Sequence, residues 1–346
     1  MGVAIRGNAG YALTPVAVTG GEFVEFGPYV ASIDGRGVVA FTAGLVGGGT
    51  GVFTGDGGVV TAVVDSRSGG GVGVGVVGEV CSHPDVDGRG RCCFYGVLKS
   101  GERGVFVAEG GEIERLANSH GALGPTMNEE GGVAFRADGE GGEGIFVSER
   151  GRTMMVARTG EEFGAFQGLP VINSAGAVVF RGDMRAGGQC IRMWDGEKTS
   201  TIIETGDEVG SELGELGSFP VLNDAGAVGF VATLRRGGSG VFVVAGGKME
   251  MVVESGGEFE SFRGVLINNA YGKGGPLVFY ATPVGGTLGV YVGRELLLGI
   301  GSGFMGSRVT EFALNPVSMN EVGQLAIRVK LEDGRQAVLR ADPEGG

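Results

Sequence analysis

The chain repeats one eight-residue phrase, Asn-x-x-Gly-x-x-x-Phe, along its whole length. The phrase is NEEGGVAF at residues 128–135, NSAGAVVF at 173–180 and NDAGAVGF at 223–230. Two copies begin with Asp (34–41 and 87–94), the copy at 320–327 ends in Ile, and the copy at 268–279 carries an insertion. The seven anchors are Asp34, Asp87, Asn128, Asn173, Asn223, Asn268 and Asn320. They lie 41 to 53 residues apart, a period that belongs to radial β-repeats.

The Asn and Gly positions of the phrase have a structural explanation. In a short hairpin built on a type I turn, an Asn or Asp side chain at the first position bonds the backbone two residues on. A Gly then takes the left-handed conformation that closes the hairpin. A ligand-binding role for the anchors is the alternative interpretation.

Each repeat divides into four short strands, named here A to D. In the fourth repeat they begin near residues 169, 177, 189 and 198. Gly-Val-Phe triplets such as residues 51–53 mark strand C, and their aromatic rings are interpreted as core between blades. Strand D follows strand C only six times, and the seventh copy is residues 11–20, at the other end of the chain. We therefore predict an all-β fold, one seven-bladed β-propeller of 28 strands spanning residues 1–346, closed by the N-terminal strand joining the last blade.

Composition narrows the possible partners. The net charge of −13 disfavours nucleic acid and anionic membrane surfaces, which require a basic face. The sequence contains no apolar stretch of about 18 residues, so it predicts no membrane span. The N-terminal residues show no apolar signal segment, so the sequence is consistent with a cytoplasmic protein or with removal of a signal peptide.

The four cysteines leave the compartment open. Cys81, Cys92 and Cys93 fall in one repeat and Cys190 in another. Cys81 precedes a turn and Cys92 and Cys93 follow it, so a cross-strand disulfide is one interpretation. Free, buried thiols that pack as small hydrophobic groups are the other.

The loops that connect strand D to the next strand A carry the first candidate site. In an antiparallel four-stranded meander these D-to-A loops share one face of the ring, and they vary in length, as functional loops do. Four of them begin with a related Gly-x-Glu phrase, which places Glu22, Glu162, Glu208 and Glu258 at equivalent heights. Such a rim attracts cations or a basic peptide, and Ca²⁺ is the ion that its oxygen atoms suit. The alternative is a solvated rim that maintains solubility, and the sequence contains no calcium-loop motif, so no cofactor is predicted.

A second candidate site lies in repeats 2 and 3. They contain the two histidines of the chain, His83 and His120, and both precede a strand A. Because strand A is innermost in a blade, both should approach the mouth of the tunnel on the D-to-A face. Together with Tyr95 they form a candidate acid and base for proton abstraction or hydrolysis.

The repeat resembles the bacterial tandem-repeat proteins that are named for the NxxGxxxF motif. That resemblance implies a secreted or surface-associated protein, although no sorting tail follows residue 342. It transfers no catalytic signature, and the sequence contains no nucleophile elbow, P-loop or zinc-protease motif.

We therefore predict a ligand-binding or interaction scaffold that presents its D-to-A face to a glycan, a peptide or a cation, in an extracytoplasmic location, with a cytoplasmic one as the alternative. A hydrolase or lyase that acts on a polysaccharide is the alternative function, and a purely structural component is a third.

Overall fold

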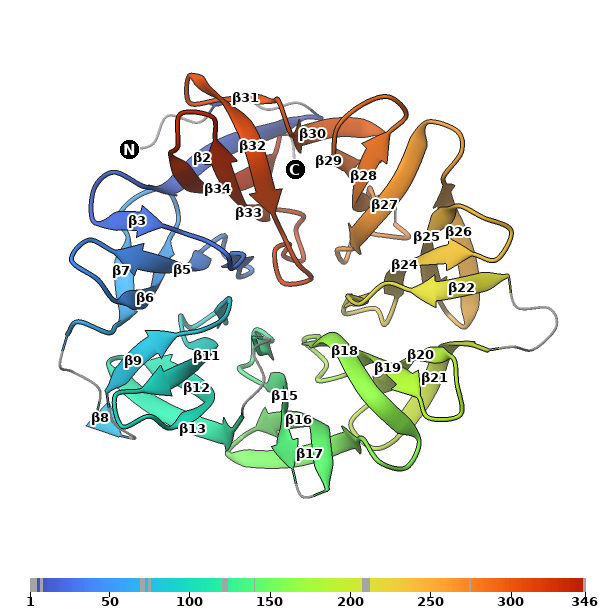
Figure 1. Cartoon of the computed structure of the whole chain (residues 1–346), viewed down its shortest axis with the longest axis horizontal. Helices are drawn as coiled ribbons and strands as arrows, with labels where there is room; N and C mark the ends of the chain where they lie inside the picture. Colours follow the sequence, from blue (N-terminus) through green and yellow to red (C-terminus); the bar gives the residue numbers. More distant parts are fainter. Residues whose placement is uncertain are drawn as a thin grey trace.

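The computed structural model describes residues 5–6, 9–68, 72–73, 76–119, 124–139, 141–206, 212–273 and 275–344. Their strands form seven antiparallel blades around one central axis (Figure 1). None of these described residues is helical, so no helix here could cross a membrane. The predicted seven-bladed β-propeller is confirmed.

Blades 1 to 4 follow one another along the chain. Blade 1 contains β3 (Phe23–Glu25), β4 (Ser32–Ile33), β5 (Val39–Leu45), β6 (Thr50–Gly55) and β7 (Thr61–Asp65). Blade 2 contains β9 (Val77–Val80), β10 (Asp85–Val86), β11 (Cys92–Leu98), β12 (Arg103–Glu109) and β13 (Glu112–Asn118), with β8 (Val72–Gly73) at its outer edge. Blade 3 contains β14 (Thr126–Met127), β15 (Val133–Gly139), β16 (Gly142–Glu149) and β17 (Arg152–Arg158). Blade 4 contains β18 (Phe163–Ile172), β19 (Val178–Met184), β20 (Gln189–Trp194) and β21 (Thr199–Thr205).

Blades 5 to 7 complete the ring. Blade 5 contains β22 (Leu213–Leu216), β23 (Val221–Leu222), β24 (Val228–Leu234), β25 (Ser239–Ala245) and β26 (Lys248–Glu254). Blade 6 contains β27 (Phe259–Leu266), β28 (Val278–Pro283), β29 (Gly289–Val292) and β30 (Glu295–Gly299). Blade 7 contains β32 (Ser307–Ala313), β33 (Leu325–Leu331), β34 (Gln336–Pro343) and β2 (Tyr11–Val18), extended by β1 (Ile5–Arg6) and β31 (Gly303–Phe304).

The N-terminal strand closes the ring as predicted. β2 pairs antiparallel with β34 along seven residue pairs, from Tyr11 opposite Pro343 to Val18 opposite Ala337. The first long strand of the chain is thus the outer strand of the last blade. The free edge that an unpaired β34 would present is covered by this pairing.

The innermost strand of most blades is interrupted, a feature that the prediction of 28 strands did not include. In blades 1, 2 and 5 it forms two short pieces, and in blades 4 and 6 its register shifts partway along. Proline stands three residues before the anchor in four repeats, at Pro84, Pro125, Pro170 and Pro220. Because proline donates no backbone hydrogen bond, the ladder breaks there and the chain bulges.

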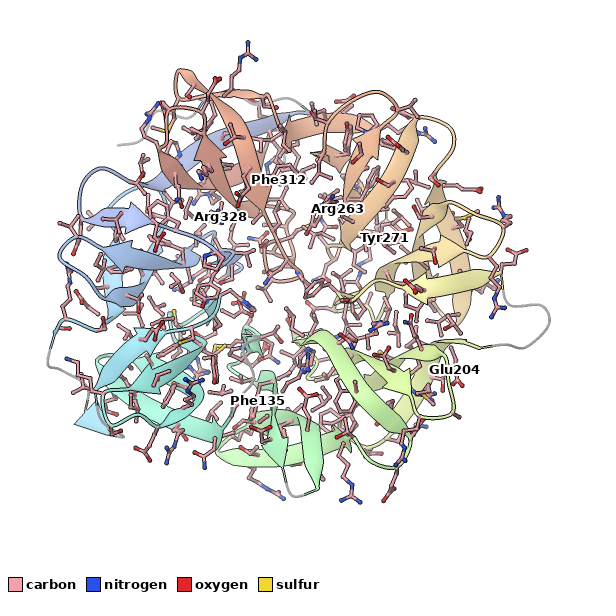
Figure 2. The ribbon with its side chains drawn as sticks, in the orientation of Figure 1. Phe135, Glu204, Arg263, Tyr271, Phe312 and Arg328 are labelled. Carbon is pink, nitrogen blue, oxygen red and sulfur yellow. The ribbon has the colours of Figure 1, made fainter. Side chains whose placement is uncertain are left out.

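The predicted aromatic core is confirmed. The Phe of the second strand stacks on the aromatic residue opposite it on the third strand in five blades, with ring centroids 5.4 to 5.9 Å apart. Phe135 and Phe94 are fully buried (Figure 2 labels Phe135). The four cysteines are free, and three of them are buried, so the predicted alternative of a cross-strand disulfide is not formed.

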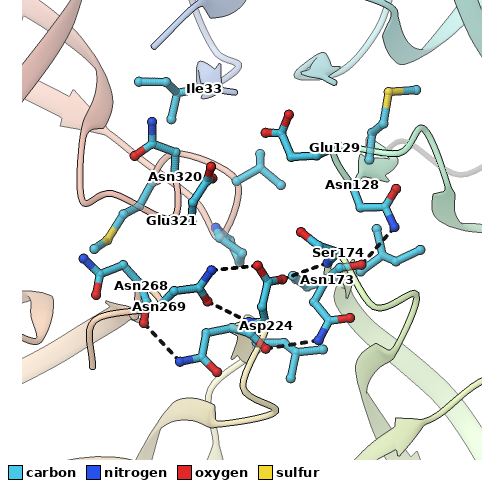
Figure 3. A pocket seen from close by; sticks show the side chains of 18 of the residues that line it. Ile33, Asn128, Glu129, Asn173, Ser174, Asp224, Asn268, Asn269, Asn320 and Glu321 are labelled. Carbon is cyan, nitrogen blue, oxygen red and sulfur yellow. Dashed lines mark hydrogen bonds between the residues drawn. The ribbon is translucent and has the colours of Figure 1, made fainter. Parts of the chain in front are cut away.

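The anchor asparagines join neighbouring blades. The Oδ1 atom of Asn173 accepts a hydrogen bond from the backbone N–H of Ala177 and so closes its own turn. Its Nδ2 atom donates to the backbone carbonyl of Asn223 in the next blade, at 3.1 Å. The same bond joins blade 3 to blade 4 through Asn128, and blade 5 to blade 6 through Asn223, and both of these are drawn in Figure 3. It also joins blade 7 to blade 1, where Asn320 donates to the backbone carbonyl of Asp34.

The two aspartate anchors are paired differently. A carboxylate has no N–H to donate to the next blade. The second oxygen of Asp34 instead accepts from the Arg36 guanidinium, and that of Asp87 accepts from Arg91. Asp therefore closes its own turn but contributes no inter-blade bond, and an arginine neutralises its buried charge.

We predict that Asn223→Asp lowers the free energy of unfolding by about 1–3 kcal/mol, the cost of leaving a buried polar group unpaired. The repeat of Asn223 has alanine at residue 225, where both aspartate repeats have arginine, and at residue 227, where the Asp87 repeat has Arg91 and the Asp34 repeat has Val38. The double variant with Ala225→Arg should recover part of the loss, because Ala225 is exposed and corresponds in position to Arg36. Denaturant unfolding measures both; a double variant no more stable than the single one would contradict this account of the aspartate anchors.

Candidate ligand-binding site

The tunnel is lined by rings of residues at fixed distances from the anchors, since each blade contributes the same strand. The position four residues before the anchor defines what we name the −4 ring. It consists of Val30, His83, Gly124, Leu169, Phe219, Gly264 and Pro316. All of these except Gly124 line one cavity of about 270 Å³. The −4 ring is therefore the wall of an axial cavity.

The cavity is largely apolar and aromatic. Tyr29, Phe219 and Tyr280 contribute rings, and Leu169 and Val265 are almost fully buried. Phe219, by contrast, is 42% exposed although it is large and hydrophobic. Since strand A runs from the D-to-A loops toward the anchor turns, the −4 ring lies on the D-to-A side of the anchors. An exposed aromatic ring in a concave apolar wall is the usual composition of a ligand pocket.

Two glycines of the −4 ring make room for larger side chains. A Cβ atom on Gly124 would lie 2.5 Å from Cε1 of His83, and one on Gly264 would lie 2.6 Å from Cε2 of Tyr280. Both distances are shorter than van der Waals contact allows. Glycine at these positions therefore fixes where the imidazole and the phenol lie.

His83 is a buried, neutral wall residue. Burial lowers the pKa of its imidazole to about 4, and the nearby backbone carbonyl of Pro125 opposes that shift only in part. Its Nε2 atom has no hydrogen-bond partner among the described residues. Because Nδ1 is on the side of Gly124 and Pro125, we place the proton there and a lone pair on Nε2. A buried lone pair without a partner is costly, and a hydrogen-bond donor on a ligand in the cavity would relieve that cost.

The opposite mouth of the tunnel is polar and acidic. A second pocket of about 110 Å³ lies at the anchor turns (Figure 3). Glu129, Asp224 and Glu321, each one residue after its anchor, line it. Glu129 accepts a hydrogen bond from the Gly35 N–H at 2.7 Å and so bridges blades 3 and 1. Burial, and then the charges of Glu321 and the aspartate anchors, raise the pKa of Glu129.

A ring of aliphatic residues lies beside this mouth. The residues one position before the anchors are Ile33, Val86, Met127, Ile172, Leu222, Ile267 and Met319, and all line the second pocket. In the sequence of each repeat, this residue lies between the −4 ring residue and the polar turn. The larger cavity is thus bounded by apolar side chains on its anchor side.

Asp85 is a buried carboxyl group at the junction of blades 2 and 3. Its Oδ2 atom accepts from the backbone N–H of Met127 at 2.6 Å, and its Oδ1 atom from that of Val86. Burial is the main cause that raises its pKa to about 8. Since Asp87 donates no bond across this junction, the Asp85–Met127 bond takes the place of the missing one.

The described glutamates of the predicted rim form ion pairs with arginines. Glu22 pairs with Arg67 at 2.7 Å, and Glu258 pairs with Arg294 at 2.7 Å. Glu162 pairs with Arg192. Glu208 lies outside the described residues. Within the described part of the chain no three His, Cys, Asp or Glu side chains are arranged to hold a metal ion.

The predicted histidine–tyrosine group is divided between two environments. His83 does line the tunnel, as expected, whereas His120 lies outside the described residues. Tyr95 is 3% exposed, and its hydroxyl group donates to the Ser119 carbonyl at 3.0 Å. It packs in the core with Phe135 and Met127 and does not line the cavity of His83.

Sequence reasoning missed most of the cavity wall, although a signal was present. The residues directly before the four prolines are His83, Gly124, Leu169 and Phe219, all members of the −4 ring. A proline three residues before the anchor indicates the interruption, and the residue before it marks the wall. Arg263 and Tyr280 carry no such signal, because blade 6 lacks the proline.

The fold and its axial cavity define a β-propeller with a pocket on its axis. Residues 33–287 match a family of unknown function, DUF7453, and the chain belongs to that family. No curated protein matches the chain.

Solved structures similar to this chain include propellers with different activities. A puromycin-hydrolyzing peptidase from Mycobacterium tuberculosis aligns over 92% of this chain and 51% of its own, at 15% identity and a TM-score of 0.57. A lectin from Burkholderia pseudomallei aligns over 92% and 95%, at 11% identity and a TM-score of 0.50. An oligogalacturonate lyase from Vibrio parahaemolyticus aligns over 98% of each chain, at 10% identity and a TM-score of 0.50. These identities show a shared fold alone.

We predict a pH-dependent contribution of Asp85 to stability. The carboxyl group is ionised above pH 3.8 when unfolded but stays protonated to about pH 8 when folded, so folding takes up a proton between these values. The unfolding free energy of the wild type, relative to Asp85→Asn, should therefore fall as the pH rises through this window, by at most about 1.4 kcal/mol per pH unit.

Denaturant unfolding of both proteins at several pH values measures this difference. His83 has a lowered folded-state pKa and contributes the opposite trend below its unfolded pKa of 6.5, but it does so in both proteins and cancels. A pH-independent difference would contradict the assignment of a protonated Asp85.

Proposed function

We propose that this protein is a ligand-binding propeller that receives its ligand in the axial cavity from the D-to-A face. The observation that carries the proposal is the −4 ring. The anchors of all seven repeats are Asn or Asp and each closes its own turn, whereas the −4 ring contains Val, His, Gly, Leu, Phe, Gly and Pro. A uniform scaffold with one diversified concave ring is the arrangement of a binding site.

The exposure of Phe219 supports binding at this ring rather than at the glutamate rim. The described glutamates of the rim are neutralised by arginines, which leaves little unpaired charge for a cation. Phe219 presents an aromatic surface that a sugar face or an apolar ligand could cover. The secreted or surface-associated location stays a prediction.

A hydrolase or lyase is the second candidate, and His83 is the observation that favours it. The imidazole is neutral and lines the cavity, so it could accept a proton from a bound substrate. Tyr95 does not support this candidate, because its hydroxyl group already donates to a backbone carbonyl.

The experiment is a ligand screen with matched variants. We expect compounds from a glycan array and a small-molecule thermal-shift library to bind the wild type and to bind Phe219→Ala about tenfold more weakly or worse, since truncating a large apolar side chain removes roughly 1.5–3 kcal/mol of burial. Met155→Ala, on the outer strand β17 and 50% exposed, is the control and should bind normally.

Hits that bind Phe219→Ala and the wild type equally would place the site elsewhere and overturn the proposal. The same hits are then incubated with the protein and analysed for products. Turnover that is lost in His83→Phe would select the enzyme, and unchanged hits would select the binding protein.

A further inference from the structure

The cavity contains a single cation. Of the described residues that line it, Arg263 alone carries a charge at neutral pH, since His83 is neutral. Arg263 is exposed, lies on β27 beside the central opening (Figure 2), and forms no ion pair with a described carboxylate. Most arginines near the tunnel are paired, as Arg328 is with Glu311. In a chain of net charge −13, an unpaired arginine in an apolar wall is complementary to an anion.

A polar group without a described partner, the Nε2 atom of His83, stands on the far side of the axis. Arg263 belongs to blade 6 and His83 to blade 2, and three blade-to-blade steps separate them in a closed ring of seven. The two side chains therefore approach the cavity from nearly opposite directions. Arg263 suits a carboxylate, which a guanidinium can hold with two parallel hydrogen bonds. The lone pair of His83 Nε2 suits a hydroxyl group or an N–H group.

The space between them suits a flat body. Tyr29, Phe219 and Tyr280 line the wall, and aromatic rings pack well on planar or cyclic groups. A cavity of about 270 Å³ is close to the lower end of the size range of small-molecule pockets.

We propose that the ligand class of this cavity is a small hydroxy-carboxylate with a planar apolar body, its carboxylate on Arg263 and its hydroxyl group on His83. The inference depends on the proposed function, because it names the ligand of the same cavity. It is independent of the peptidase, lectin and lyase similarities, which concern the fold alone.

The test uses the full chain and three probes, measured by calorimetry or ligand-observed NMR. We expect 4-hydroxybenzoate to bind about tenfold more tightly than its uncharged isostere 4-hydroxybenzamide, and more tightly than benzoate, which lacks the hydroxyl group. Added salt should weaken the binding of 4-hydroxybenzoate more than that of the amide, because the ion pair with an exposed arginine is screened.

Matched variants assign each end of the ligand. Arg263→Gln should weaken 4-hydroxybenzoate about tenfold and leave 4-hydroxybenzamide unchanged within about twofold. His83→Phe, which keeps an aromatic ring but removes the Nε2 lone pair, should abolish the preference for 4-hydroxybenzoate over benzoate. Arg152→Gln, an exposed position on the outer strand β17, makes the same charge change away from the cavity and should have no effect. If His83→Phe fails to fold, Arg263→Gln still decides, because Arg263 is exposed.

Four outcomes would overturn the inference. Equal binding of acid and amide would remove the role of Arg263, as would normal acid binding by Arg263→Gln. Stronger binding of a peptide that ends in tyrosine, which offers the same phenol and carboxylate, would assign the site to a chain terminus instead. Uncharged ligands that depend on Phe219 would refute this ligand class while leaving the proposed function intact. If no ligand at all depends on Phe219, the proposed function itself fails.

Discussion

The amide side chain of the anchor asparagine is the interaction on which this ring depends. One end of the amide accepts from the turn that follows it, and the other end donates to the neighbouring blade. Local turn formation and the joining of blades are thus properties of one side chain, and they are satisfied together. Because the bonds lie at buried asparagines near the axis, water cannot replace them without cost. The spacing of the anchors along the chain then sets where every other residue of strand A stands in the tunnel.

The cavity follows from the same spacing. Fixing the anchors at one level fixes the residues four positions earlier at another level, so seven distant segments contribute to one wall. The prolines release the strand from its ladder at that level, which gives the wall freedom to vary while the turns remain uniform. A repeat protein can in this way carry one specific site, although each of its units performs the same structural role.

The sequence predicted the elements that depend on local rules, and it missed those that depend on contacts between blades. The turn at Asn173, the stacked pair Phe230 and Phe242, and the closure by β2 all follow from residue type and spacing. The pairing of Glu162 with Arg192 could not be predicted, because Arg192 stands on strand C, where five other blades have an aromatic residue. Likewise Arg263 reaches the cavity because of a register shift in β27, and no pattern in the sequence predicts that shift.

The sector around blade 2 departs from the repeat in two linked ways. Its anchor is Asp87, which donates no bond to blade 3, and the junction is joined instead by the buried Asp85. In the same blade the residue before the proline is His83, the polar member of an otherwise apolar −4 ring. Asp85 and His83 are both buried ionisable groups that the neighbouring structure holds neutral near pH 7, one protonated and the other deprotonated. Asp85 serves the ring by joining blade 2 to blade 3, whereas the neutral imidazole of His83 supplies a polar contact inside an apolar cavity. Blade 2 is therefore the blade in which the repeat departs from the others and contributes a polar group to the cavity.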